Sequence, residues 1–164
     1  MDFLLRLEQS GFATWVREGG TIWGYPFILF CHTLGLGTLA GVNGSIDLRI
    51  LGFAPQLPLA PLKRFFPLLW GAFAVTAASG TALLVADATT KLASPVFYVK
   101  MVFVALAIAN LQLLKTHVFG NPRLDEQNLP GSARLLAVTS LLFWIAATTA
   151  GRLMAYLGPV SGLK

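Results

Sequence analysis

Residues 24–49 of this 164-residue chain read GYPFILFCHTLGLGTLAGVNGSIDLR. They include a run of roughly 20 residues without a formal charge, which is long enough to cross a bilayer as a helix. At about 100° per residue, one face of that helix is polar and collects Tyr25, His32, Leu39, Asn43 and Asp47. A second, displaced face is a stripe of small residues, Thr33, Gly37, Ala40, Gly41 and Gly44. Because hydrocarbon does not solvate polar groups, the polar face must point into a bundle or at another subunit.

The composition excludes a soluble globular protein. The chain is 55% hydrophobic and 12% charged, with a mean hydropathy of +0.70, whereas soluble domains carry about 25% charged residues. Its net charge of +5 comes from Lys and Arg residues scattered at the ends of apolar runs, so lipid headgroups rather than nucleic acids are the expected partners. The single cysteine, Cys31, excludes an intramolecular disulfide and a cysteine-pair metal site. No cleavable signal is evident, and the first span is expected to act as its own insertion signal.

The order of apolar runs and turn signals predicts an all-α fold, a four-helix transmembrane bundle preceded by an interfacial amphipathic helix. The amphipathic helix is expected over residues 1–18, which carry too many charges to be buried. The chain then forms a single membrane domain with spans at about 22–42, 67–88, 95–114 and 133–154. The first helix is expected to continue to about residue 51, and proline-rich and polar stretches connect the spans.

His32 is the residue most in need of an explanation, because it lies roughly 15 Å deep in the first span. It is either a ligand of haem or a metal, or part of a proton relay, or a neutral imidazole hydrogen-bonded to a neighbouring helix. If a cofactor such as haem b is bound, Tyr25 and Asn43 on the same face are its further contacts.

A second axial ligand is hard to find within one chain. His117 belongs to the far end of the third span, roughly 15–18 Å from His32 in depth, and is expected to be solvated. Met101 and Met154 are expected nearer the outer ends of their helices than His32. Haem would therefore need His32 alone, another ligand or a second copy of the chain.

Catalysis by the isolated chain is not predicted. Two histidines at different depths do not supply the three ligands of a metallohydrolase. Ser79 could reach the depth of His32, but no buried carboxylate is at hand to complete a triad. We therefore predict no catalytic residues and no protein metal site.

Charged residues near the ends of the spans are expected to be interfacial. Asp47 and Arg49 lie where the first helix leaves the membrane, and should pair with headgroups or loop charges. Lys100 and Arg152 flank the opposite face, where they either snorkel or together bind an anion or a headgroup.

Two other features are predicted to serve packing. The stripe with Gly37, Gly41 and Gly44 predicts close helix packing, with the approach of a flat cofactor as the alternative. Trp144, near mid-depth in the fourth span, is also predicted to pack rather than to contact a cofactor.

Four short segments follow one another along the chain in a characteristic order. They are Trp15-Val-Arg-Glu, the aromatic-Pro run leading to His32-Thr-Leu-Gly-Leu, Asp47-Leu-Arg-Ile-Leu-Gly52, and Ser94-Pro-Val-Phe-Tyr-Val-Lys-Met101. In these segments the chain resembles a family of small bacterial four-helix integral membrane proteins of unknown function. The resemblance implies the fold and the bacterial inner membrane. A more distant similarity to CopD-type copper-resistance and cytochrome-b-like bundles, which carry His in early helices, implies haem or copper, although this chain lacks a second buried histidine and a Met-rich copper motif.

Lys and Arg are divided six against six between the two sides of the predicted topology. Acidic residues dilute the set on the side of the termini, and we therefore predict that both termini lie outside. Two hypotheses for function follow. The chain is a non-catalytic accessory subunit of a larger membrane complex or homo-oligomer, or it is a haem- or metal-binding electron-transfer protein that uses His32. A small transporter or channel, which would require oligomerisation, is the remaining alternative.

Overall fold

The computed structural model of the chain describes residues 2–120 and 129–156. The described residues form helices and no strand, in the order α1 (Asp2–Glu8), α2 (Gly11–Glu18), α3 (Tyr25–Ile50), the 3₁₀ segment η1 (Ala60–Phe65), α4 (Phe66–Ala86), α5 (Ala88–Ala93), α6 (Pro95–Leu113), the π segment η2 (Leu114–Val118) and α7 (Gly131–Tyr156). The predicted all-α, four-helix bundle is confirmed.

Four of these helices are long and apolar enough to cross a membrane. The longest, α3, has 26 residues and so measures about 39 Å at 1.5 Å per residue, against roughly 30 Å of hydrocarbon in a bilayer. The predicted start of the third span is accurate: α6 begins at Pro95, after the N-cap residue Ser94, whose side chain makes no capping hydrogen bond. These four helices support a multi-pass membrane protein.

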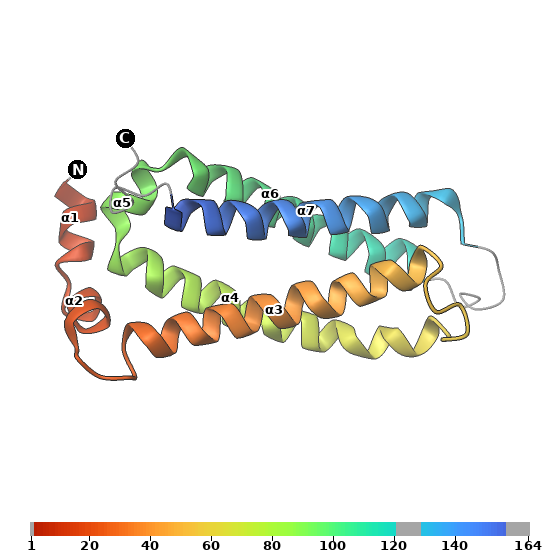
Figure 1. Cartoon of the computed structure of the whole chain (residues 1–164), viewed down its shortest axis with the longest axis horizontal. Helices are drawn as coiled ribbons and strands as arrows, with labels where there is room; N and C mark the ends of the chain where they lie inside the picture. The colour runs from red at the N-terminus through yellow and green to blue at the C-terminus, as the bar shows by residue number, and fades with distance from the viewer. Residues whose placement is uncertain (1, 121–128, 157–164) are drawn as a thin grey trace.

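The long helices form two antiparallel hairpins, α3 with α4 and α6 with α7, which meet chiefly along α3 and α7 (Figure 1). Buried apolar side chains from all four helices, among them Leu39, Leu69, Leu111 and Ala137, make one core. Contact between α4 and α6 is slight. The bundle is therefore closed along one side and more open between α4 and α6.

The close contact inside the first hairpin is made at Gly35 and Gly80, not at the predicted glycine stripe. A Cβ on Gly35 would lie 2.5 Å from Thr76 Oγ1 and 3.1 Å from the carbonyl oxygen of Ala72. A Cβ on either Gly37 or Gly41 would have no described atom within 4 Å outside its own helix. Gly37 follows Gly35 by two residues, about 200° around the helix, so α4 covers one of them and leaves the other uncovered.

Gly44, the third glycine of the predicted stripe, lies at a looser contact. A Cβ there would meet Leu141 of α7 at 3.6 Å, an ordinary packing distance. Packing within the chain therefore accounts for Gly44 alone among the three, and the stripe's role toward another subunit stays a prediction.

The N-terminal region is two short helices rather than the single predicted one. The chain breaks at Ser10, whose hydroxyl accepts a hydrogen bond from the Ala13 amide at 3.3 Å and caps α2. Ala13 and Val16 are buried, and α2 packs against α4 while α1 packs against α5. The helices thus cover the end of the bundle where α4 and α5 meet (Figure 1).

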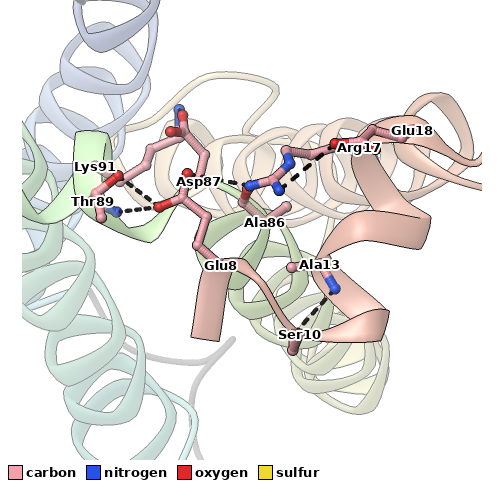
Figure 2. Close-up of polar contacts among 9 residues, drawn as sticks. All are labelled: Glu8, Ser10, Ala13, Arg17, Glu18, Ala86, Asp87, Thr89 and Lys91. Carbon is pink, nitrogen blue, oxygen red and sulfur yellow. Dashed lines mark hydrogen bonds and ion pairs between the residues drawn. The ribbon is translucent and has the colours of Figure 1, made fainter. Parts of the chain in front are cut away.

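A polar clamp holds these helices to the bundle (Figure 2). The Glu8 carboxylate accepts hydrogen bonds from the hydroxyl and amide of Thr89, at 2.6 and 3.2 Å. Arg17 donates to Glu8 Oε1 at 3.2 Å and to the carbonyl oxygen of Ala86 at 3.0 Å. Ala86 is the last residue of α4, so Arg17 satisfies a helix-terminal carbonyl that would otherwise lack a partner.

Glu8→Ala is expected to loosen α1 and α2 without unfolding the bundle. Glu8 and Arg17 side chains are 21% and 32% exposed, so the loss in global stability should be about 1 kcal/mol or less. Amide hydrogen exchange over residues 2–18 should accelerate. Glu18→Ala is the matched control, because Glu18 is 67% exposed and 3.9 Å from Arg17. Equal exchange in the two variants would contradict the clamp.

Candidate intramembrane binding site

A cavity of about 220 Å³ lies between the two hairpins, at the level of His32. We call it the inner cavity. Its wall includes residues from all four long helices, among them His32, Phe73, Gly80, Lys100, Met101 and Trp144. A second space of about 210 Å³, the outer cavity, shares His32, Gly80, Leu84, Phe97 and Lys100 with it and extends to Tyr25, Asp87 and Lys91. The two cavities therefore adjoin, with His32 and Lys100 at their boundary.

The His32 side chain forms hydrogen bonds with the neighbouring helix α4. Its Nδ1 lies 3.0 Å from the carbonyl oxygen of Thr76 and 3.3 Å from Ser79 Oγ. A carbonyl oxygen only accepts hydrogen bonds, so we assign the proton to Nδ1, which leaves Nε2 as the free nitrogen of the ring. Gly80 makes room for this ring, because a Cβ there would lie 2.9 Å from His32 Cε1. The hydrogen-bonded interpretation of His32 is thus realised through Nδ1, while Nε2 stays available to a ligand.

Lys100 enters the same site from α6. Its side chain lies against Gly151 of α7, where a Cβ would be 3.6 Å from Cε and 3.8 Å from Nζ. Within residues 2–120 and 129–156, Lys100 has neither a hydrogen bond nor an ion pair. The acid that lines the outer cavity, Asp87, is already paired with Lys91 at 3.1 Å. The Lys100 ammonium therefore lacks a counterion among the described side chains.

Trp144 supplies a third polar group. It is 4% exposed and belongs to the core, as predicted, but it also lines the inner cavity. Its indole Nε1 has no acceptor among the described residues. A buried donor without a partner is costly, so an acceptor on a bound molecule would stabilise this arrangement.

The predicted polar face of α3 is divided between two places in the structure. His32 and Leu39 line the inner cavity and Tyr25, which is 47% exposed, lines the outer one. Asn43 and Asp47 line neither, so the prediction that Asn43 contacts a cofactor beside His32 is not supported by the cavity walls.

Asn43 and Asp47 form a separate buried network with α7. Asn43 Nδ2 donates to Asp47 Oδ2 at 2.8 Å and to Ser140 Oγ at 2.7 Å, and all three residues are 0% exposed. Asp47 is therefore not the interfacial charge that was predicted, because α7 packs over this part of α3. Ser140 could not have been identified from sequence, since only the packing of α7 on α3 brings it to Asn43.

Arg49 and Arg152 do not contribute to the cavities. Arg49 donates to the carbonyl oxygens of Leu57 and Pro55, at 2.5 and 3.0 Å, and so fastens the loop that follows α3. Arg152 is exposed and lines neither cavity, whereas Lys100 lines both. The predicted joint anion site of Lys100 and Arg152 is therefore replaced by Lys100 alone.

The possible axial partners of His32 lie near the ends of their helices, as predicted. Met101 is the seventh residue of α6 and Met154 is two residues from the end of α7, whereas His32 is the eighth residue of α3. Met101 nevertheless lines the inner cavity together with His32, and Met154 lines the outer one. His117 is exposed, bonds locally to Leu113 and Thr116, and lies 17 residues beyond Lys100, roughly 25 Å along the helix. The two histidines are thus far apart, as predicted, and His117 lies farther along the bundle than the expected distance of roughly 15–18 Å.

Comparison of the chain with family models, curated proteins and solved structures finds no match. Among the described residues, no group of three or more His, Cys, Asp or Glu side chains could hold a metal ion.

Proposed function

We propose that the protein is a non-catalytic binding subunit of the membrane, which holds a small apolar molecule or cofactor in the inner cavity through His32. The observation that carries this proposal is the meeting of His32, Lys100 and Trp144 on the wall of one largely apolar cavity. A few convergent polar groups in an apolar pocket are typical of a ligand site. The cost of leaving these groups without partners in a membrane bundle favours an occupant.

The accessory role in a larger complex or homo-oligomer is supported by the outer face of α3. Gly37 and Gly41 are uncovered within the chain, and Phe30, Thr33, Leu34, Gly37 and Thr38 line a shallow groove there. In lipid, small residues let a second helix approach closely. We further propose, from the resemblance and the charge distribution, that the membrane is the bacterial inner membrane and that both termini are outside.

Haem-dependent electron transfer is the second candidate. The hydrogen bond from Nδ1 to Thr76 leaves Nε2 free to ligate, as a backbone carbonyl does for many ligating histidines. Met101 on the same wall offers a thioether, and a His/Met pair is a known axial set for haem that transfers single electrons. The inner cavity is smaller than the roughly 300–1,000 Å³ usual for ligand pockets, so haem would require α4 and α6 to separate.

The test is native mass spectrometry of the whole chain purified in a non-ionic detergent, together with its visible spectrum. We expect a non-covalently bound molecule that is lost or at least tenfold depleted in His32→Ala. His117→Ala is the matched control, because His117 is exposed at the opposite end of the bundle. A Soret band lost only in His32→Ala would assign haem, and copies or other subunits in the same spectrum would establish the assembly. A protein that carries nothing, or an occupant retained in His32→Ala, would refute the binding function.

A further inference from the structure

We propose that the molecule bound at His32 is an amphipathic anion, an apolar body with one acidic group, whose charge is neutralised by Lys100. This inference rests on the proposed binding function and names its ligand class. It starts from the position of the lysine: the sixth residue of α6, roughly 8 Å into that helix.

A lysine at this depth could extend its side chain toward the headgroups. The side chain of Lys100 packs against α7 instead. It lies against Gly151, and the residue lines both cavities. Arg152, the next residue of α7, is exposed instead. Lys100 and Arg152 therefore differ, because Lys100 lines the cavities and Arg152 is exposed.

The charged residues that line the outer cavity, Asp87, Lys91 and Lys100, have a net charge of one positive unit. Lys91 and Asp87 neutralise one another at 3.1 Å, and Lys100 has no acid in the described part of the chain. An unpaired ammonium in an apolar setting is unfavourable. An acidic group on a ligand is the component that the walls lack.

The rest of the wall fits the apolar body of such a molecule. Leu36, Phe73, Leu84, Phe97 and Val104 line the inner cavity, which lies on the side where α4 and α6 make slight contact. His32, whose Nδ1 is bonded to α4, offers Nε2 as a further nitrogen for a polar atom of the acid or of a neighbouring carbonyl or hydroxyl. A lipid-soluble molecule would reach this site from the bilayer.

Trp144 also provides the readout, because bromine atoms on a bound chain quench a nearby indole. The whole protein in non-ionic detergent is titrated with 9,10-dibromostearic acid and with its methyl ester, and tryptophan fluorescence is recorded. We expect the acid to bind at least tenfold more tightly than the ester, since only the acid pairs with Lys100. Dibrominated phosphatidic acid forms a second arm, in which stronger quenching than by the fatty acid assigns a phosphate rather than a carboxylate.

Three substitutions show where in the protein the acid binds. Lys100→Gln should abolish the preference for the acid, and Arg152→Gln, which removes a nearby exposed charge, should leave it intact. Trp144→Phe should remove the acid-specific quenching, which shows that the signal comes from this cavity and not from the other tryptophans. Circular dichroism of each variant checks that it is folded.

The inference is overturned if acid and ester quench equally in the wild-type protein, or if Lys100→Gln keeps the preference. Acid-specific quenching that persists in Trp144→Phe also overturns it. Equal binding of acid and ester that is lost in His32→Ala would leave the proposed binding function standing and refute only the anion. Absence of any quenching, in a protein that carries no molecule by mass spectrometry, would refute both.

Discussion

Gly35→Ala is expected to destabilise the bundle by about 2 kcal/mol, although alanine is the better helix former. The new Cβ would lie 2.5 Å from Thr76 Oγ1 and 3.1 Å from the carbonyl oxygen of Ala72, so backbone atoms of α3 and α4 must move apart. Overpacking of this kind costs roughly 1–3 kcal/mol. The midpoint of thermal unfolding in detergent, followed by circular dichroism, measures the loss.

Gly37→Ala is the matched control, two residues along the same helix. A Cβ there would meet no described atom within 4 Å, so the gain in helix propensity, up to about 1 kcal/mol, should appear without a penalty. Opposite signs for the two substitutions are the expected pattern. If Gly35→Ala is as stable as Gly37→Ala, the contact between α3 and α4 is not where the structure places it.

The same substitution should affect the site. Gly35 sets the distance between α3 and α4 one turn from His32, whose Nδ1 bonds to the Thr76 carbonyl across that contact. Separation of the helices therefore weakens the bond that orients the imidazole. Gly35→Ala should lose part of any bound molecule, in the mass-spectrometric measurement described above, while Gly37→Ala keeps it.

Asn43→Leu is expected to have the other large effect, a loss of about 3 kcal/mol. Asn43 is 0% exposed and donates hydrogen bonds to both Asp47 and Ser140. Leucine would leave those two groups buried without this donor, and each such group costs roughly 1–3 kcal/mol. Thermal unfolding in detergent again provides the measurement.

A control and a rescue separate this network from a general effect of polar residues in α3. Ser45→Ala, on an exposed serine that bonds only to the Gly41 carbonyl one turn back, should change stability by less than about 0.5 kcal/mol. Asn43→Leu combined with Asp47→Leu should recover much of the loss, because removing both partners avoids a buried unsatisfied carboxyl group. A double variant no more stable than Asn43→Leu would show that the cost arises from packing.

Local signals in the sequence predict the elements of this fold well. The start of α6 follows from Ser94-Pro95, because the N–H that proline lacks would have no partner in the first helical turn. The first long helix begins at Tyr25, three residues after the predicted start at about 22. The number of spans follows from the length of the apolar runs, since a bilayer demands roughly 20 residues of each. Gly11 likewise marks an interruption of the amphipathic pattern, but only the structure shows that a second helix, capped by Ser10, begins there.

The helical wheel placed His32, Asn43 and Asp47 on one face, and all three do turn toward other helices. Their different surroundings could not be predicted, because a wheel gives direction around one helix but not which neighbour lies at each height. In the structure α4 holds His32 while α7 covers Asn43 and Asp47. For the same reason, the sequence cannot distinguish Gly35, which packs tightly against α4, from Gly37, which α4 leaves uncovered.

The amino-acid sequence by itself therefore determined that this is an all-α membrane bundle, that His32, Asn43 and Asp47 share one face of α3, and that His32 and His117 are far apart. These are consequences of hydrophobic run length, helical period and rise per residue, which are local. Only the tertiary structure decided that Lys100, Met101 and Trp144 share a cavity with His32 and that Asp47 is buried. Those facts depend on the offset and rotation of α6 and α7 against the first hairpin, which are set by packing between side chains distant in the chain.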